Sequence, residues 1–178
     1  MLCKVAQVIQ LTYEPSLDPY HTVFRFLRLR PIVAEYGPMH KDHARILDFY
    51  QLLPFRISEI RLLPQHRRFR SLSASYEKPY GEQPESRLLF QRMEPIQVAA
   101  LDTLANHNVY SAARWQLNEL SATDEAVPTE LAARLHEINE EDPALESFLK
   151  TLAADYRLSG IDGLKHRTGL LEHRHDAI

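Results

Sequence analysis

The last sixteen residues, GLKHRTGLLEHRHDAI (163–178), gather three histidines with acids and bases beside them. If this segment is helical, Glu172, His175 and Asp176 share one face, because they lie three and four residues apart. Glu-x-x-His is the spacing of carboxylate-bridged di-iron bundles, but such a site also needs a second pair and two more inward glutamates. The sequence supplies no evident candidates for these ligands. The segment therefore indicates a solvated polar helix or a docking tail, and a small metal-dependent enzyme built on it is an alternative.

Other routes to catalysis are weaker. The triplet NHN (106–108) has the residue types of a ββα-metal nuclease, but it falls at an expected helix end without the strand pair that such a site needs. The sequence contains no GxxxxGK[ST], GxGxxG or GxSxG motif. Cys3 lies too close to the chain end to be a well-positioned nucleophile. We expect a protein that is not an enzyme and that holds no metal or cofactor.

Composition restricts the class of protein further. The chain has 178 residues, of which 44% are apolar, and its net charge is −3. These values predict one folded domain over 1–178, with a helical core at about 17–158 and a tail at 160–178. One cysteine and the lack of an apolar run near the roughly 18 residues of a membrane span indicate a soluble, cytoplasmic protein with no membrane partner.

Two Asp-Pro pairs each predict the start of a helix, with Asp as N-cap and Pro at the first position. The first helix begins after Asp18, and Pro31 is expected to end it. Its predicted buried face is Tyr20, Val23, Phe24 and Leu27. The second begins after Asp142, and its apolar stripe is Leu145, Phe148, Leu149, Leu152 and Tyr156.

The remaining elements follow from periodicity and from glycine and proline positions. Helices are expected over 42–53, with Ile46, Phe49, Tyr50 and Leu53 inward, and over 56–63, 86–93, 94–108 and 128–141. A short basic helix can follow at 64–76, and RWQLNEL (114–120) is the best strand candidate. The predicted fold class is mainly α, a compact helical domain with a small β element. A winged-helix-like core, with 114–120 in its wing, is one arrangement that fits this order.

Charge is distributed unevenly along the chain. The segment 55–75 contains five arginines and one acid, for a net charge of +4, whereas 118–156 has a net charge of −8. The arginines are Arg56, Arg61, Arg67, Arg68 and Arg70, and they are the candidate contacts to DNA phosphate. The alternative is a solvated face paired with acids elsewhere in the chain.

Four segments together resemble the middle-component proteins of bacterial ABC-three-component systems, which include the Lamassu-type antiphage and antiplasmid defences. They are LDPYHTVFRFLRL, ARILDFYQLLPFRISEIRL, LFQRMEPIQVAALDTLA and IDGLKHRTGLLEHRHDA, in this order along the chain. The residues that carry the resemblance are Asp18, Tyr20, His21, Arg25, Asp48, Phe49, Tyr50, Gly163, Leu164, Arg167, Thr168, Gly169 and Asp176.

The resemblance implies a function without catalysis. Such a subunit bridges an SMC- or Rad50-like ABC ATPase that senses DNA and an effector that is often a nuclease, with DNA as a further partner. The candidate docking residues are Lys165, Arg167, Thr168, Glu172, Arg174 and Asp176. We also expect that deleting 162–178 affects assembly more than folding. A stand-alone winged-helix DNA-binding regulator is the other alternative.

Overall fold

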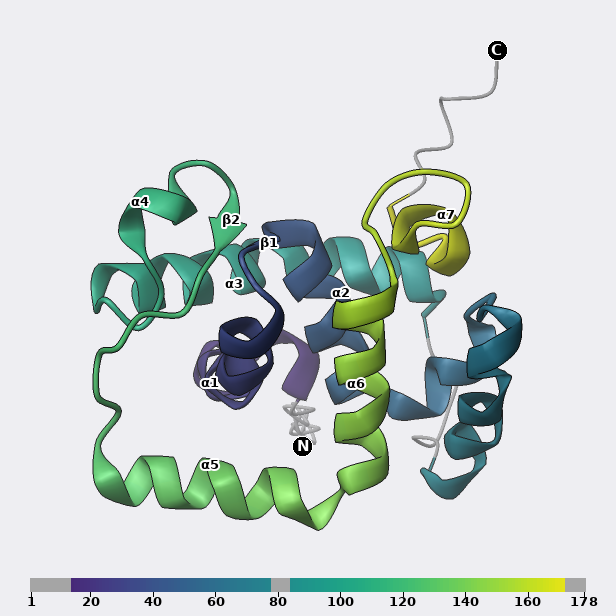
Figure 1. Ribbon diagram of the computed structural model, residues 1–178, viewed down its shortest axis with the longest axis horizontal. Helices are drawn as coiled ribbons and strands as arrows, with labels where there is room; N and C mark the ends of the chain where they lie inside the picture. Colours follow the sequence, from purple (N-terminus) through teal and green to yellow (C-terminus); the bar gives the residue numbers. More distant parts are fainter. Residues whose placement is uncertain (1–13, 78–83, 172–178) are drawn as a thin grey trace, which may run out of the picture.

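The computed structural model describes residues 14–77 and 84–171, which form a compact helical fold with one small sheet (Figure 1). Its interior lies among α1 (Pro19–Tyr36), α2 (Lys41–Leu52), α3 (Ser86–Asn106) and α6 (Pro143–Asp155). The other elements are the 3₁₀ helices η1 (Pro15–Leu17), η2 (Pro54–Glu59) and η3 (Pro64–Ser75), the helices α4 (Ala112–Trp115), α5 (Thr129–Glu141) and α7 (Leu164–Thr168), and the strands β1 (Met39–His40) and β2 (Glu119–Leu120). This confirms the predicted class.

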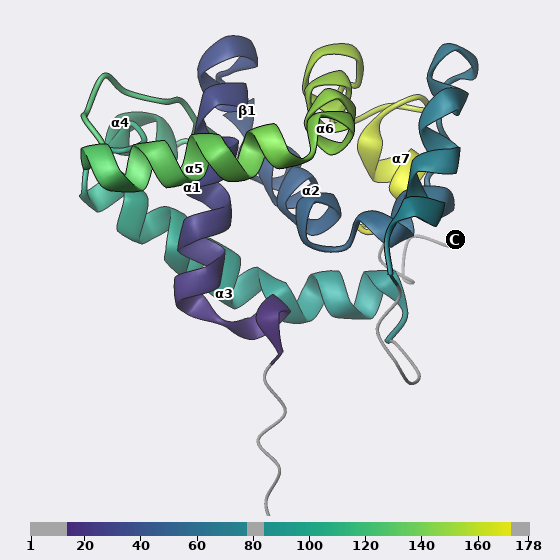
Figure 2. The same ribbon diagram turned by 90° about the horizontal axis from the view of Figure 1, so that it is seen from below.

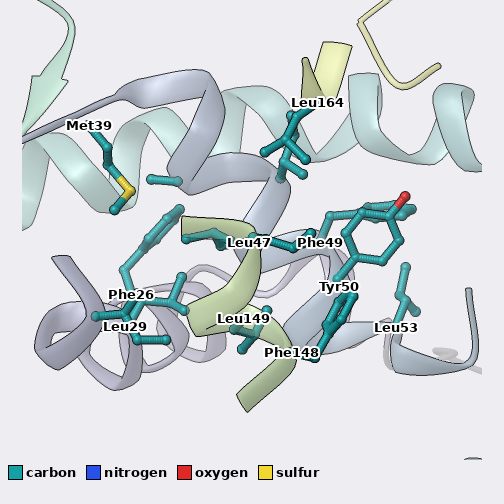
Figure 3. Close-up of a cluster of buried hydrophobic side chains, with 14 of the residues drawn as sticks. Phe26, Leu29, Met39, Leu47, Phe49, Tyr50, Leu53, Phe148, Leu149 and Leu164 are labelled. Atoms are coloured by element: carbon teal, nitrogen blue, oxygen red, sulfur yellow. The ribbon is translucent and has the colours of Figure 1, made fainter. Parts of the chain in front are cut away.

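Helix α2 runs through the centre of the fold, and every residue from 43 to 51 is buried. Figure 3 shows the apolar cluster around it. The Phe49 ring meets the Tyr50 and Phe90 rings edge-on, with centroids 5.2 and 5.7 Å away, and Tyr50 meets Phe148 of α6 at 6.2 Å. Burying each such side chain contributes roughly 1.5–3 kcal/mol. The predicted stripe of Ile46, Phe49, Tyr50 and Leu53 is therefore confirmed as core.

Helix α1 begins as predicted but does not end at Pro31. Asp18 caps it, with Oδ1 accepting a hydrogen bond from the His21 amide at 2.7 Å. The helix then continues through Pro31 to Tyr36. Proline removes only one helical hydrogen bond, and here its ring is exposed while Ile32 and Val33 beyond it are buried. Their burial offsets the lost bond.

The buried face of α1 is also rotated from the prediction. Leu27 is buried, Val23 and Phe24 are half-buried, and Tyr20 is 87% exposed. The face that enters the core instead includes Thr22, Arg25, Phe26, Leu29 and Val33. Two of these residues are polar, so an apolar pattern could not identify this face.

Two further helix predictions need correction. The segment 86–106 is one helix, because Pro95 is exposed and buried Met93 and Gln97 on either side of it hold both halves against the core. The segment 56–63 is not a helix. The 3₁₀ helix η2 ends at Glu59, and the chain then runs extended into Pro64, which disfavours helical geometry in the residue before it.

The small sheet joins distant parts of the chain. β1 pairs antiparallel with β2, with Met39 opposite Leu120 and His40 opposite Glu119. Of the predicted strand 114–120, only the last two residues are extended, because 112–115 form α4. β2 pairs with the strand before α2 and not with a hairpin neighbour, so a winged-helix-like core is not confirmed.

Helix α6 lies between α5 and η3. All five residues of its predicted apolar stripe are buried, which confirms that prediction. In Figures 1 and 2, α5 lies on one side of α6 and η3 on the other, and α5 crosses the outside of α1. The α5 part of the acidic segment is therefore apart from η3 in space, whereas α6, which also belongs to the acidic segment, packs against η3.

Candidate functional site

The basic segment forms the outer face of η3. A 3₁₀ helix has three residues per turn, so residues three apart share a face. His66 and Phe69 turn inward, and the Phe69 ring lies 5.4 Å from that of Phe148 in α6. This inward anchor leaves Arg67 and Arg70 together on the exposed side.

Arg68 is exposed next to them. Its guanidinium lies over the Phe69 ring, 4.9 Å from the centroid. The three arginines 67, 68 and 70 thus form a solvent-facing cationic surface, which we call the η3 arginine face. It is an exposed part of the predicted phosphate-contacting set, and that contact stays a prediction.

Arg56 is directed elsewhere. It is 5% exposed, and its guanidinium donates to the carbonyl oxygen of Pro84 at 2.7 Å and to Oγ of Ser86 at 2.5 Å. Nη1 of Arg56, the atom that donates to Ser86, also lies 3.4 Å from Oε1 of Glu59. Arg56 therefore joins η2 to the start of α3, and the cationic surface that meets solvent lies mainly in η3.

Arg61 and Arg167 belong to two different predicted sites, and the structure brings them together. The Arg61 amide donates to the Arg167 carbonyl oxygen at 3.1 Å, and Nη1 of Arg167 donates to the Arg61 carbonyl oxygen at 2.6 Å. The Arg61 guanidinium also donates to the carbonyl oxygen of His166. These contacts fasten the C-terminal segment to the chain between η2 and η3.

The C-terminal segment is part of the core as far as residue 171. Leu164 and Leu170 are 0% and 1% exposed, and Figure 3 shows Leu164 reaching the apolar cluster. Thr168 Oγ1 donates to the Leu164 carbonyl oxygen at 2.7 Å, which closes α7. Deleting 162–178 would remove both leucines, so we revise our expectation: this deletion should unfold the protein.

The remaining docking candidates divide into two groups. Lys165 is partly exposed, with its ammonium 4.0 Å from the Asp42 carboxylate. Glu172, Arg174 and Asp176 lie outside the described residues, as does His175. The metal-site alternative rests on that part of the chain and stays untested. Within 14–77 and 84–171, no group of three or more His, Cys, Asp or Glu side chains could hold a metal ion.

One acid–base arrangement was not predicted from the sequence. His66 places Nδ1 3.0 Å from the Tyr156 hydroxyl and Nε2 3.0 Å from Oδ2 of Asp155. The Tyr156 hydroxyl also accepts a hydrogen bond from the Leu63 amide at 3.0 Å. Burial raises the pKa of Tyr156, which keeps the hydroxyl protonated. With His66 and Tyr156 both buried, the arrangement joins η3 to α6.

The most extensive polar network lies inside the fold. Asp48 accepts hydrogen bonds from Arg25 at 2.6 and 3.1 Å and from Gln97 at 2.8 Å. Arg45 donates to Gln97 at 3.0 Å and to Asp42 at 2.8 Å. These side chains come from α1, α2 and α3, so the network fixes how the three helices pack.

These observations define a helical protein with a polar interior network and separate cationic and acidic surfaces. In the described parts of the chain, no helix is long and apolar enough to cross a membrane. The family of ABC-three component (ABC-3C) system Middle Component 5 matches residues 11–176, and the chain belongs to this family. The predicted resemblance to middle components is thus confirmed. Neither a search of curated proteins nor one of solved structures finds a match.

Proposed function

We propose that this chain is a non-catalytic scaffold subunit of a bacterial antiphage and antiplasmid defence complex. It joins an SMC- or Rad50-like ABC ATPase, which senses DNA, to an effector of the nuclease class, as in Lamassu-type systems. Membership of the middle-component family supports a partnership with other components of such a system. The observation that carries the proposal is that the acidic helix α5 and the η3 arginine face lie on opposite sides of α6. A subunit that contacts several partners in one complex needs distinct surfaces for them.

The η3 arginine face is the proposed contact to DNA within the assembled complex. Arg67 and Arg70 are one 3₁₀ turn apart, a rise of about 6 Å, and both are exposed. Each phosphate contact would add affinity that does not depend on sequence and that falls as salt rises. DNA binding should therefore depend on the complex as a whole, with this face adding to contacts made by the ATPase.

The primary test is co-expression with the neighbouring genes and purification through a tag on this subunit. The expected eluate contains an ABC ATPase and an effector in fixed ratio with the tagged chain. Recovery of the chain alone would count heavily against the scaffold function. Sequence-selective duplex binding by the isolated chain would favour the stand-alone regulator, and a stoichiometric transition metal in the purified protein would favour the metal-dependent enzyme.

The DNA contact is tested by Arg67→Glu combined with Arg68→Glu. The matched control is Arg114→Glu with Arg134→Glu, which changes the net charge equally at two exposed arginines outside η3. We expect the first pair to weaken retention of the complex on DNA and to flatten its salt dependence, because up to two phosphate contacts are lost. Equal retention by both pairs across a salt titration would remove DNA from this face.

A further inference from the structure

Helix α5 is only lightly packed against the rest of the fold. Of its thirteen residues, only Leu135 is buried. Near its C-terminal end, Asn139 and Arg28 of α1 exchange two hydrogen bonds of 2.9 and 3.1 Å. Before its N-terminal end, Arg30 donates to the carbonyl oxygens of Thr123 and Glu125 at 2.7 and 2.6 Å. Polar ties thus hold α5 across α1 at two places.

Between these ties lies a groove with a volume of about 540 Å³. We call it the α1–α5 groove. The apolar residues that line it are Leu27, Pro31 and Ala34 of α1, Ala122 and Val127 of the linker, and Ala132 and Leu135 of α5. Pro31, Ala34 and Ala132 are exposed, so apolar surface is open to solvent inside the groove. A groove of this kind suits a segment that inserts a few large apolar side chains.

Two carboxylates, Glu140 and Glu146, and one arginine, Arg30, line the groove. Arg30 donates to the linker carbonyl oxygens. Lys150 lies 3.1 Å from Glu146 and 3.6 Å from Glu35, so it already pairs with two carboxylates. Glu140 lines the groove and pairs with no basic side chain among the residues described. Glu125 of the linker, whose carbonyl oxygen accepts from the lining residue Arg30, also pairs with none of these basic side chains. An occupant with its own positive charges would form ion pairs with these carboxylates.

We propose that the α1–α5 groove binds an amphipathic segment of a partner subunit, with two or three large apolar residues flanked by lysine or arginine. The apolar side chains enter the groove, and the flanking cations meet Glu125 and Glu140 at its rim. The proposal rests on the proposed function, because the partner is the ATPase or the effector of the same system. It assigns the acidic side of the molecule to a protein contact and leaves the η3 arginine face for DNA.

The test uses two neighbouring alanines of α5. Ala132 lines the groove and Ala133 does not, although both are exposed on the same helix. Ala132→Arg places a bulky cation in the groove, whereas Ala133→Arg makes the same change outside it. In the co-expression experiment, we expect Ala132→Arg to lower recovery of one partner subunit on the order of tenfold, as for loss of a central interface contact. Ala133→Arg should recover both partners as the unchanged chain does.

The outcomes separate the two proposals. If the unchanged chain recovers neither subunit, the scaffold function fails. If it recovers both, and a folded Ala132→Arg protein does so equally, the groove proposal alone is overturned. If Ala132→Arg does lower recovery, a photo-crosslinking residue at position 132 identifies the segment that occupies the groove. A partner peptide with apolar residues beside Lys or Arg supports the proposal, while a peptide from residues 1–13 of this chain, or from a second copy, overturns it.

Discussion

Nε of Arg25 donates a 2.6 Å hydrogen bond to Oδ1 of Asp48, and Nη2 donates to Oδ2 at 3.1 Å, with both side chains almost fully buried. The pair joins α1 to α2 in the middle of the protein. Gln97 of α3 donates to the same carboxylate, so side chains from three helices meet at Asp48. Arg25 and Asp48 are both among the residues that carry the family resemblance, and the structure gives them a packing role.

Replacing Asp48 with Asn should therefore be severely destabilising. The change leaves the guanidinium of Arg25 buried without its counter-charge, and breaking a buried ion pair in this way costs about 3–5 kcal/mol. The measurement is the free energy of unfolding from urea denaturation. Glu137→Gln is the control, since it breaks an exposed ion pair with Arg134 and should leave the midpoint unchanged. Equal midpoints for both variants would show that the interior pair does not stabilise the packing.

The sequence predicted the fold best where local chemistry decides it. Asp18 and Asp142 mark helix starts because a capping carboxylate needs only nearby amides, and both act as caps in the structure. The helix boundaries predicted at Pro31 and next to Pro95 were wrong, because burial of the residues beyond each proline outweighs the one lost hydrogen bond. That balance depends on tertiary packing, which periodicity does not report.

The surfaces were predictable only in part. Arg67, Arg68 and Arg70 are exposed, but Arg56 and Arg61 bind the chain's own carbonyl oxygens. A run of arginines does not reveal which of them face acceptors within the fold. The α1–α5 groove had no sequence signal, since its lining comes from α1, the linker, α5 and α6, which come together only in the folded chain.

His43 should make stability depend on pH. Its pKa is lowered, chiefly by burial, although the hydrogen bond to the Leu152 carbonyl oxygen at 3.1 Å acts in the opposite direction. Above the usual histidine pKa of about 6.5, the His43 side chain is neutral in both the folded and the unfolded state, so its burial does not reduce the free energy of unfolding. As pH falls below that value, the unfolded state binds a proton that the folded state does not, so the free energy of unfolding decreases.

The measurement is urea denaturation between pH 5 and 8 for the unchanged chain and for His43→Gln, which keeps an N–H donor. The variant should lose part of the decrease at low pH, at most about 1.4 kcal/mol per pH unit for one proton. His107→Gln changes an exposed histidine and is the control. Identical pH slopes for the unchanged chain and His43→Gln would show that His43 does not titrate differently on folding.

Leu164 should behave as a core residue although it lies near the end of the chain. Its side chain is fully buried, so Leu164→Ala should lower the free energy of unfolding by about 2–5 kcal/mol. Ile161→Ala removes an apolar side chain from the same segment at a site that is 83% exposed, and it should change little. Similar losses for both would mean that the segment does not pack as described.

Docking by Glu172, Arg174 and Asp176 is testable separately by deleting 172–178, because this deletion leaves the buried Leu164 and Leu170 in place.

Arg167 should hold the C-terminal segment in place through its forked guanidinium. Nη1 donates to the Arg61 carbonyl oxygen at 2.6 Å, and Nε donates to the Asp162 carbonyl oxygen at 3.0 Å. Arg167→Ala removes both bonds, so we expect a loss of about 1–3 kcal/mol. Arg167→Lys should not restore stability, because one ammonium cannot reproduce the fork.

Amide hydrogen exchange localises the effect of Arg167. The Arg61 amide donates to the Arg167 carbonyl oxygen, so its exchange should accelerate in Arg167→Ala as the segment opens. Lys165→Ala is the control, because Lys165 lies in the same helix but makes only a distant contact with Asp42. Protection of the Arg61 amide that is unchanged in Arg167→Ala would show that the buried leucines alone hold the segment. Faster exchange at Arg61 in Arg167→Ala, with Lys165→Ala unchanged, would assign this closure to the guanidinium.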